Sequence, residues 1–170
     1  MAYTLSPDGN LTQLLFAHEE GLRLSSRFPT TFMVDATYKT NSIKLPLISI
    51  VGTTCTNQTL FSAFALIFSE CEMNYLWVIS NFKLLLEERS GDLPTVFDTD
   101  NDVSLMSAIA ETFPSASKLL CSWHVNKNVL IHANKCLATR ENAEDALQRW
   151  RDLLAKFLPF WGSFHLRNGL

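Results

Sequence analysis

Two apolar segments of this chain end abruptly in carboxylates, and this arrangement restricts what the chain can fold into. The segment 32–34 runs directly into Asp35, and the segment 95–97 runs into an acidic cluster of Asp98, Asp100 and Asp102. An ionised Asp at the mouth of a buried strand is costly unless a cation or a hydrogen-bond donor meets it. Carboxylates delivered by separate strands of one sheet are the ligands that a magnesium or manganese site needs. The sequence therefore predicts a sheet with an acidic metal site where its strands end.

Length and composition predict a compact fold of one domain. The chain has 170 residues, 47% of them hydrophobic, with 12 Phe and only 6 Gly, which argues against disorder. Charged residues make up 18% of the chain, below the usual quarter, so we expect part of the surface to be apolar and covered by other segments of a longer protein. The net charge of −3 predicts no general attraction to nucleic acid, so any contact with DNA must be local.

The sequence also restricts the compartment. The cysteines at 55, 71, 121 and 136 are too few and too scattered for a disulfide scaffold, so we interpret them as reduced thiols. The chain has no uninterrupted run of about 18 apolar residues that would span a membrane. Its first residues lack the basic and apolar regions of a signal peptide. We expect an intracellular protein with no membrane partner.

Hydrophobic periodicity predicts an alternating order of strands and helices. Residues 1–29 form a lead-in with a short helix bearing Leu11, Leu14, Leu15 and His18. The pattern then predicts strands over 31–37, 45–54 and 59–68, a helix over 72–88, a strand over 94–98, a helix over 105–113, a strand over 117–121, and helices over 124–137 and 141–158. Three meandering strands followed by alternating units imply a mixed α/β sheet with helices packed on it, in the order of the ribonuclease H-like fold.

Three short motifs, in order along the chain, carry a family resemblance. They are Asp35-Ala-Thr-Tyr-Lys-Thr-Asn41, then Thr99-Asp100-Asn-Asp102, then Cys121-Ser-Trp-His124. With these motifs the chain resembles the catalytic domain of Mutator-like element (MULE) transposases over roughly residues 30–135. The resemblance implies an RNase H-like core at 30–138, and a helix and tail at 139–170 that start a truncated insertion region.

The same resemblance implies site residues. Members of this family act on DNA through two Asp and one Glu, so Asp35 would be the first of these carboxylates and Asp100 the second. Both would be catalytic and would bind Mg²⁺ or Mn²⁺. Cys121 and His124 would form the family's motif between the second Asp and the Glu. The third carboxylate is not identified, because none of the downstream acids stands in a recognised context: Glu141, Glu144, Asp145 and Asp152.

Several of these residues have alternative interpretations. Asp98 and Asp100 would share one face of a continuing strand, and Asp100 is preferred because the family's Thr-Asp falls there. Asp102 is expected to cap a helix. Lys39 and Asn41 follow the first acidic strand and are candidate phosphate contacts, although a solvated loop explains them equally well.

Cys121 and His124, followed by His132 and Cys136, supply the ligand types of a zinc site. Three of them would lie on one helix at spacings of eight and four, and Cys121 would have to reach them from a strand end. We therefore expect a buried Cys beside a hydrogen-bonded His, and no zinc.

Two functions remain open, and a zinc-stapled interaction module is a third, weaker option. The first is a transposase-derived core for metal-dependent hydrolysis and strand transfer of DNA phosphodiesters at transposon ends, inactive in this chain if the third carboxylate is absent. The second is a domesticated DNA-binding regulatory protein that kept the fold without catalysis. Both place the protein in the nucleus, where it self-associates or forms part of a longer transposase.

Overall fold

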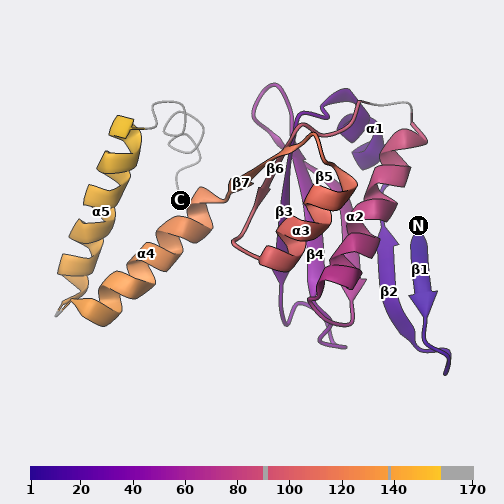
Figure 1. Ribbon diagram of the computed structural model, residues 1–170, viewed down its shortest axis with the longest axis horizontal. Coiled ribbons are helices and arrows are strands. Elements are labelled where there is room, and N and C mark those ends of the chain that lie inside the picture. The colour runs from indigo at the N-terminus through magenta and orange to yellow at the C-terminus, as the bar shows by residue number, and fades with distance from the viewer. Residues whose placement is uncertain (90–91, 138, 158–170) are drawn as a thin grey trace. The chain divides into compact units, whose positions relative to one another are not determined.

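The chain consists of two compact units, Met1–Leu119 and Leu120–Leu170. The computed structural model describes residues 1–89, 92–137 and 139–157. A seven-stranded mixed sheet with three helices makes up the first unit, and two helices make up the described part of the second (Figure 1). The tail expected at 159–170 lies outside the described residues.

The sheet has the strand order β1-β2-β5-β4-β3-β6-β7. β3, β4 and β5 form an antiparallel meander, and β6 pairs with β3 in parallel. This confirms the predicted mixed sheet and the RNase H-like order. The strands are β1 (Ala2–Leu5), β2 (Leu11–Phe16), β3 (Thr31–Thr37), β4 (Leu47–Thr53), β5 (Thr59–Ile67), β6 (Val96–Thr99) and β7 (Ser117–Leu120).

The lead-in differs from the prediction, because its first elements are strands. The helix expected around Leu11–Leu15 is wrong: β2 covers these residues, pairs with β5 through Leu15 and Ala65, and extends the sheet with β1. Leu11 and Leu15 are four residues apart, a spacing that fits one face of a helix and also one face of a strand. The free edge of β5 decides between the two by offering hydrogen-bond partners to β2.

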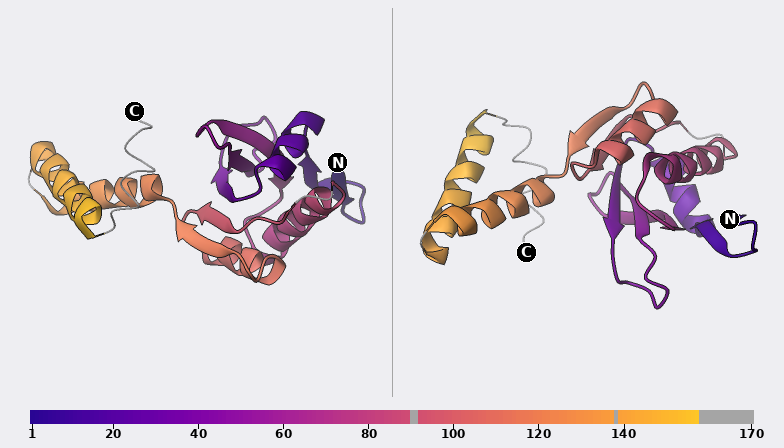
Figure 2. Two further views of the ribbon diagram at one scale, coloured as in Figure 1. Left: turned by 90° about the horizontal axis from the view of Figure 1, so that it is seen from above. Right: turned by 60° about the horizontal axis from the view of Figure 1, so that its bottom comes forward.

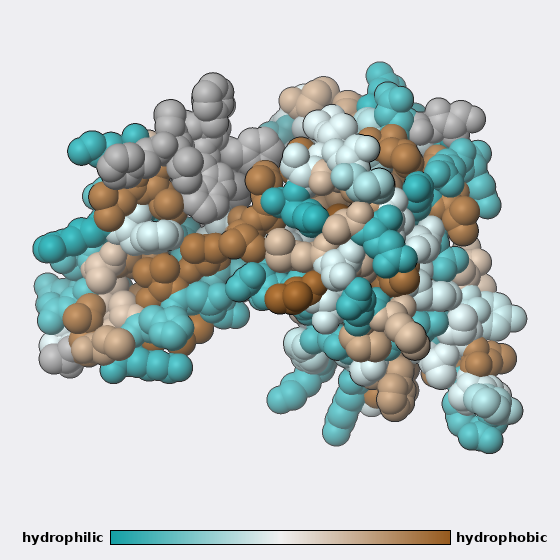
Figure 3. Space-filling view, in the orientation of Figure 1, coloured by the Kyte–Doolittle hydropathy of each residue, from teal (hydrophilic) through white to brown (hydrophobic). Residues whose placement is uncertain are grey.

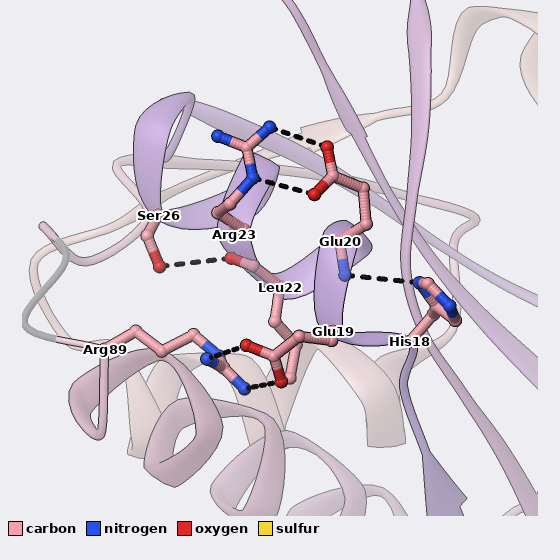
Figure 4. Close-up of polar contacts among 7 residues, drawn as sticks. All are labelled: His18, Glu19, Glu20, Leu22, Arg23, Ser26 and Arg89. Carbon is pink, nitrogen blue, oxygen red and sulfur yellow. Dashed lines mark hydrogen bonds and ion pairs between the residues drawn. The ribbon is translucent and has the colours of Figure 1, made fainter.

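Helix α1 (Glu19–Arg27) begins where β2 ends and packs on β5. His18 caps it, with Nδ1 accepting a hydrogen bond from the Glu20 backbone N–H at 3.2 Å (Figure 4). Both terminal nitrogens of the Arg89 guanidinium donate to the Glu19 carboxylate at 2.6 and 2.7 Å, which ties α1 to the residues after helix α2 (Glu72–Glu87). A Cβ at Gly21 would collide with the Phe61 carbonyl oxygen, so glycine permits the close approach of α1 to β5.

The hydrophobic core lies between one face of the sheet and two helices, α2 (Glu72–Glu87) and α3 (Val103–Thr112). Figure 2 shows both helices on the same side of the sheet. Phe32, the second residue of β3, is fully buried and meets Phe82 of α2 edge-on, with ring centroids 5.4 Å apart. Each large side chain here removes apolar surface from water, which is the main stabilising contribution to the fold.

The second unit is a pair of packed helices, α4 (Ser122–Cys136) and α5 (Arg140–Phe157). Ala143 and Leu147 of α5 are buried. Other apolar side chains of the pair stay at the surface, as Figure 3 shows along these helices, including Ile131 and Leu153, which are 41% and 51% exposed. In the part of the chain that the structure describes, every helix is too short or too polar to cross a membrane.

Candidate functional site

The register between β3 and β6 brings the two predicted carboxylates to one edge of the sheet. The strands run parallel, and their last paired residues are Val34 and Thr99. Asp35 and Asp100 are the next residues on the two strands. Because neighbouring strands lie about 4.8 Å apart, both side chains start from adjacent backbone positions. Segments that are distant in sequence thus deliver carboxylates to a common edge.

Asp35 and Asp98 belong to the face of the sheet away from α2 and α3. Val34 and Thr99 are buried on the core face, so the alternation along each strand turns Asp35 and Asp98 to the opposite face. Asp35 and Asp98 are half-buried, whereas Asp100, one residue past β6, is exposed. Among the three, Asp100 is therefore the most accessible to a ligand from solvent.

Asp102 has the role that the sequence predicts, a cap at the start of α3. Its Oδ1 accepts hydrogen bonds from the backbone N–H groups of Ser104 at 2.8 Å and Leu105 at 3.1 Å. Asp100 accepts a hydrogen bond from the Asn101 N–H at 2.7 Å. The cap satisfies two N–H groups that a helix start leaves without intrahelical partners, and it fixes the end of the loop that carries Asp100.

Sequence reasoning missed a further acid at this edge, Glu70, in the connection between β5 and α2. Burial raises the pKa of the Glu70 carboxyl, and the negative charges of Asp102 and Asp35 raise it further, whereas a hydrogen bond with Tyr75 lowers it. β5 runs in the same direction as β3, so its carboxyl end reaches the same edge. The sequence pattern that identified Asp35, an acid shortly after an apolar strand, is also present at Glu70 and could have identified it.

The loop between β3 and β4 contains the two candidate phosphate contacts, of which Asn41 is hydrogen-bonded within the loop and Lys39 is exposed. The Asn41 side chain bridges the loop: its Nδ2 donates to the Leu45 carbonyl at 2.7 Å, and its Oδ1 accepts from the Leu45 N–H at 3.0 Å. Lys39 is exposed, with a positive φ of 59°. Asn41 thus shapes the loop, while Lys39 keeps its charge in solvent.

Cys121 and His124 belong to the second unit, at the start of α4. Cys121 is the N-cap residue of α4 and is buried. His124 lies in the first turn of the helix, where its ring is edge-on to that of Trp123 with the ring centroids 4.7 Å apart. Cys136 is the last residue of the same helix, whose 15 residues span about 22 Å. Cys121 and Cys136 therefore stand at opposite ends of α4 and do not share a tetrahedral zinc ion.

Three of the four downstream acids considered as the third carboxylate make side-chain contacts along α5. Glu144 pairs with Arg140 at 2.9 Å, and Asp145 pairs with Arg149 at 2.9 Å. Asp152 accepts a hydrogen bond from Gln148, also at 2.9 Å. These are ordinary one-turn pairs on a helix surface, and each contributes a few tenths of a kcal/mol, about 0.2–0.5.

The acidic edge is chemically suited to a hard divalent cation. Among the described residues, no group of three or more His, Cys, Asp or Glu side chains is placed to hold a metal ion. Mg²⁺, however, is commonly bound by one or two carboxylates together with waters and substrate phosphates. Asp35 and Asp100, on adjacent strand ends, fit that requirement.

Comparisons with known proteins agree with this architecture. A family model described as "MULE transposase domain" matches residues 31–128, which include β3, β6 and the first turns of α4. Protein FAR1-RELATED SEQUENCE 5 of Arabidopsis thaliana is 27% identical over 166 residues, covering 89% of this chain and 21% of the relative.

Two further relatives extend the comparison. Protein FAR-RED IMPAIRED RESPONSE 1 of Arabidopsis thaliana is 27% identical, with 92% of this chain and 20% of the relative covered. The PKS-NRPS hybrid synthetase cheA of Chaetomium globosum is 30% identical over 122 residues, 72% of this chain and 3% of that protein. The chain spans about a fifth of the length of the two Arabidopsis relatives. With more than half of its residues matched by the family model and its acidic strand ends in register, the chain belongs to the MULE transposase family.

Proposed function

We propose that this chain is the core of a transposase-derived protein that binds Mg²⁺ or Mn²⁺ through Asp35 and Asp100 and acts on DNA phosphodiesters. The reaction would be hydrolysis and strand transfer at transposon ends. The observation that carries this proposal is the parallel register of β3 and β6, which brings the two carboxylates to one edge. Membership of the MULE family supports DNA as the substrate.

The electrostatics of the edge support a cation. The pKa of Glu70 is raised partly by the negative charges of Asp102 and Asp35. Acids from three different segments of the chain therefore repel one another at this edge. A cation offsets this repulsion, which otherwise opposes the folded state. The same negative potential repels a phosphate backbone, so DNA approaches this edge more favourably when a cation is bound.

Each residue has a distinct role in this proposal. Asp35 and Asp100 hold the cation, which, when bound, activates water and stabilises the leaving oxygen of the phosphodiester. Lys39, exposed on the loop after β3, contacts a DNA phosphate as a point charge. Asn41 keeps that loop closed through its two hydrogen bonds to Leu45.

Metal binding by single variants of the full chain tests the proposal. Asp35→Asn is expected to abolish Mn²⁺ binding measured by titration calorimetry or by the electron paramagnetic resonance of free Mn²⁺, because an amide replaces a charged ligand. Asp8→Asn is the matched control, since Asp8 is exposed in the turn between β1 and β2. Unchanged Mn²⁺ affinity in Asp35→Asn would contradict the proposal.

A second function is favoured by a different observation: among the described residues no three His, Cys, Asp or Glu side chains are placed to hold one metal ion, and the third carboxylate is not identified. In this alternative the chain is a DNA-binding regulatory protein that kept the fold without catalysis. DNA nicking that requires Mg²⁺ or Mn²⁺ together with Asp35 and Asp100 distinguishes the enzyme. DNA binding that is indifferent to metal and to both substitutions distinguishes the regulator.

Both functions require DNA as the partner, and we propose the nucleus as the compartment for that reason. We further propose that the chain works as part of a longer protein or by self-association. Its match to only about a fifth of its Arabidopsis relatives supports the first of these. The exposed apolar side chains of α4 and α5 are surfaces that such a partner would cover.

A further inference from the structure

Tyr75, near the start of α2, links two of the loops at the acidic edge. Its ring is buried in the core at 1% exposure, and its phenol donates a hydrogen bond to Oδ2 of Asp102 at 3.1 Å. The same hydroxyl also influences Glu70, which precedes α2, because it lowers the pKa of the Glu70 carboxyl. One side chain from the core thus reaches the loop after β5 and the loop after β6.

The hydroxyl of Tyr75 calls for a specific explanation. A phenylalanine would fill the same space, and a buried hydroxyl without a partner costs free energy. Burial and the neighbouring charges of Asp102 and Glu70 raise the pKa of the phenol, so the group stays neutral and keeps its proton for donation. The hydroxyl therefore offsets its own burial by holding Asp102.

Asp102 is held on both of its carboxylate oxygens. Oδ1 caps α3 through Ser104 and Leu105, and Oδ2 accepts from Tyr75. On the other side, the loop is held by the pairing of Thr99 with Val34. Asp100 lies between these two anchors, so its position relative to β3 depends on both.

We propose that Tyr75 is a positioning residue for the acidic edge, where its phenol fixes Asp102 and thereby holds Asp100 opposite Asp35. This inference rests on the proposed function, in which Asp35 and Asp100 bind a divalent cation. Tyr75 does not touch the cation. It acts through Asp102, as residues behind a metal ligand set commonly do, and changes at such residues typically weaken metal affinity 10- to 100-fold.

The test uses the full chain and two independent readouts. Tyr75→Phe keeps the buried ring and removes only the hydroxyl, and Tyr38→Phe is the matched control because Tyr38 is 60% exposed. In metal-free buffer, Tyr75→Phe is expected to speed amide hydrogen exchange at Ser104 and Leu105 roughly three- to tenfold, the effect of one lost hydrogen bond. In the presence of Mn²⁺, it is expected to weaken binding by about tenfold or more.

Asp102→Asn separates position from charge. The amide oxygen still caps α3, and the amide nitrogen can donate to the phenol oxygen, so the geometry is kept while the charge is removed. Its Mn²⁺ affinity is expected to stay within about threefold of wild type, the effect of removing one nearby solvent-screened charge. A loss as large as that of Asp100→Asn would make Asp102 a metal ligand and overturn the positioning role.

The remaining outcomes are separable. Unchanged amide exchange at Ser104 and Leu105 in Tyr75→Phe would overturn the role of Tyr75, whether or not the Mn²⁺ affinity changes. Faster exchange with unchanged Mn²⁺ affinity would also overturn it, because Tyr75 would then hold the loop without affecting metal binding. If the wild-type chain bound no Mn²⁺ through Asp35 and Asp100, the proposed function itself would fail. The exchange data would still show whether Tyr75 holds the loop.

Discussion

The carboxyl of Glu70 experiences two effects of the same sign. Partial burial disfavours its ionised form, and the charges of Asp102 and Asp35 do so as well, while the hydrogen bond with Tyr75 opposes them only in part. The pKa of Glu70 is therefore higher in the folded chain than in the unfolded one. It follows that Glu70 favours folding while it is protonated, and that this contribution is lost as the pH rises through its folded pKa.

Replacing Glu70 by Gln should consequently stabilise the metal-free chain at neutral pH. We expect the gain in the free energy of unfolding to stay below about 1 kcal/mol, because solvent screens much of the repulsion. The gain should shrink toward zero when the pH is lowered until wild-type Glu70 is protonated. Urea unfolding at several pH values in the presence of a chelator measures this. An equal gain at every pH would show that the charge is not its cause.

At the scale of single elements, strand ends were easier to predict from the sequence than strand partners. β3 was predicted at its observed bounds, because the apolar segment stops abruptly at Asp35 and Thr37 precedes a polar loop. The helix at Leu11–Leu15 was predicted wrongly, because local spacing does not show that β5 has a free edge. Glu70 was missed for a related reason, since its proximity to Asp35 depends on the direction of β5 within the sheet.

The contact between α1 and β5 gives a prediction at the same scale. Gly21→Ala adds a Cβ that collides with the Phe61 carbonyl oxygen, so α1 must shift away from the sheet. We expect a loss of about 1–3 kcal/mol in the free energy of unfolding, although alanine is the better helix former by roughly 1 kcal/mol. Arg23→Ala on the same helix, at an exposed position, should cost much less.

Thermal and urea unfolding of the two variants make that comparison. If Gly21→Ala proved as stable as wild type or more so, helix propensity would outweigh the contact. The close packing of α1 on β5 would then not contribute measurably to stability.

For the whole molecule, stability is concentrated where one face of the sheet meets α2 and α3. Phe82→Ala should lower the free energy of unfolding by about 3–5 kcal/mol, because a fully buried ring that packs on Phe32 leaves a cavity. Leu84→Ala, two residues along the same helix, should cost less than about 1 kcal/mol, since Leu84 is 55% exposed. Equal losses in denaturant titrations of the two variants would contradict this location of the core.

At this scale the sequence predicted the fold class and the acidic edge, because both follow from local patterns repeated along the chain. The division into Met1–Leu119 and Leu120–Leu170 was not predicted: a single core was expected over 30–138. The sequence shows α4 as one more helix after a strand, and its local pattern does not tell which compact unit the helix joins. The motif at Cys121 and His124 was visible in the sequence, but its role is still a prediction.

The parallel pairing of β3 with β6 bears on the stage of folding at which Asp35 and Asp100 come together. The β3-β4-β5 meander is built from neighbouring segments and closes short loops, whereas β6 must return across α2 before it can pair with β3. Non-local pairings form late, because the entropy of closing a long loop is lost before any contact compensates for it. We therefore expect a partly folded chain to carry Asp35 on a finished meander without Asp100 beside it. Any affinity of this edge for a cation should then appear only after β6 has paired, so that the ion stabilises the completed sheet and does not direct the assembly of the meander.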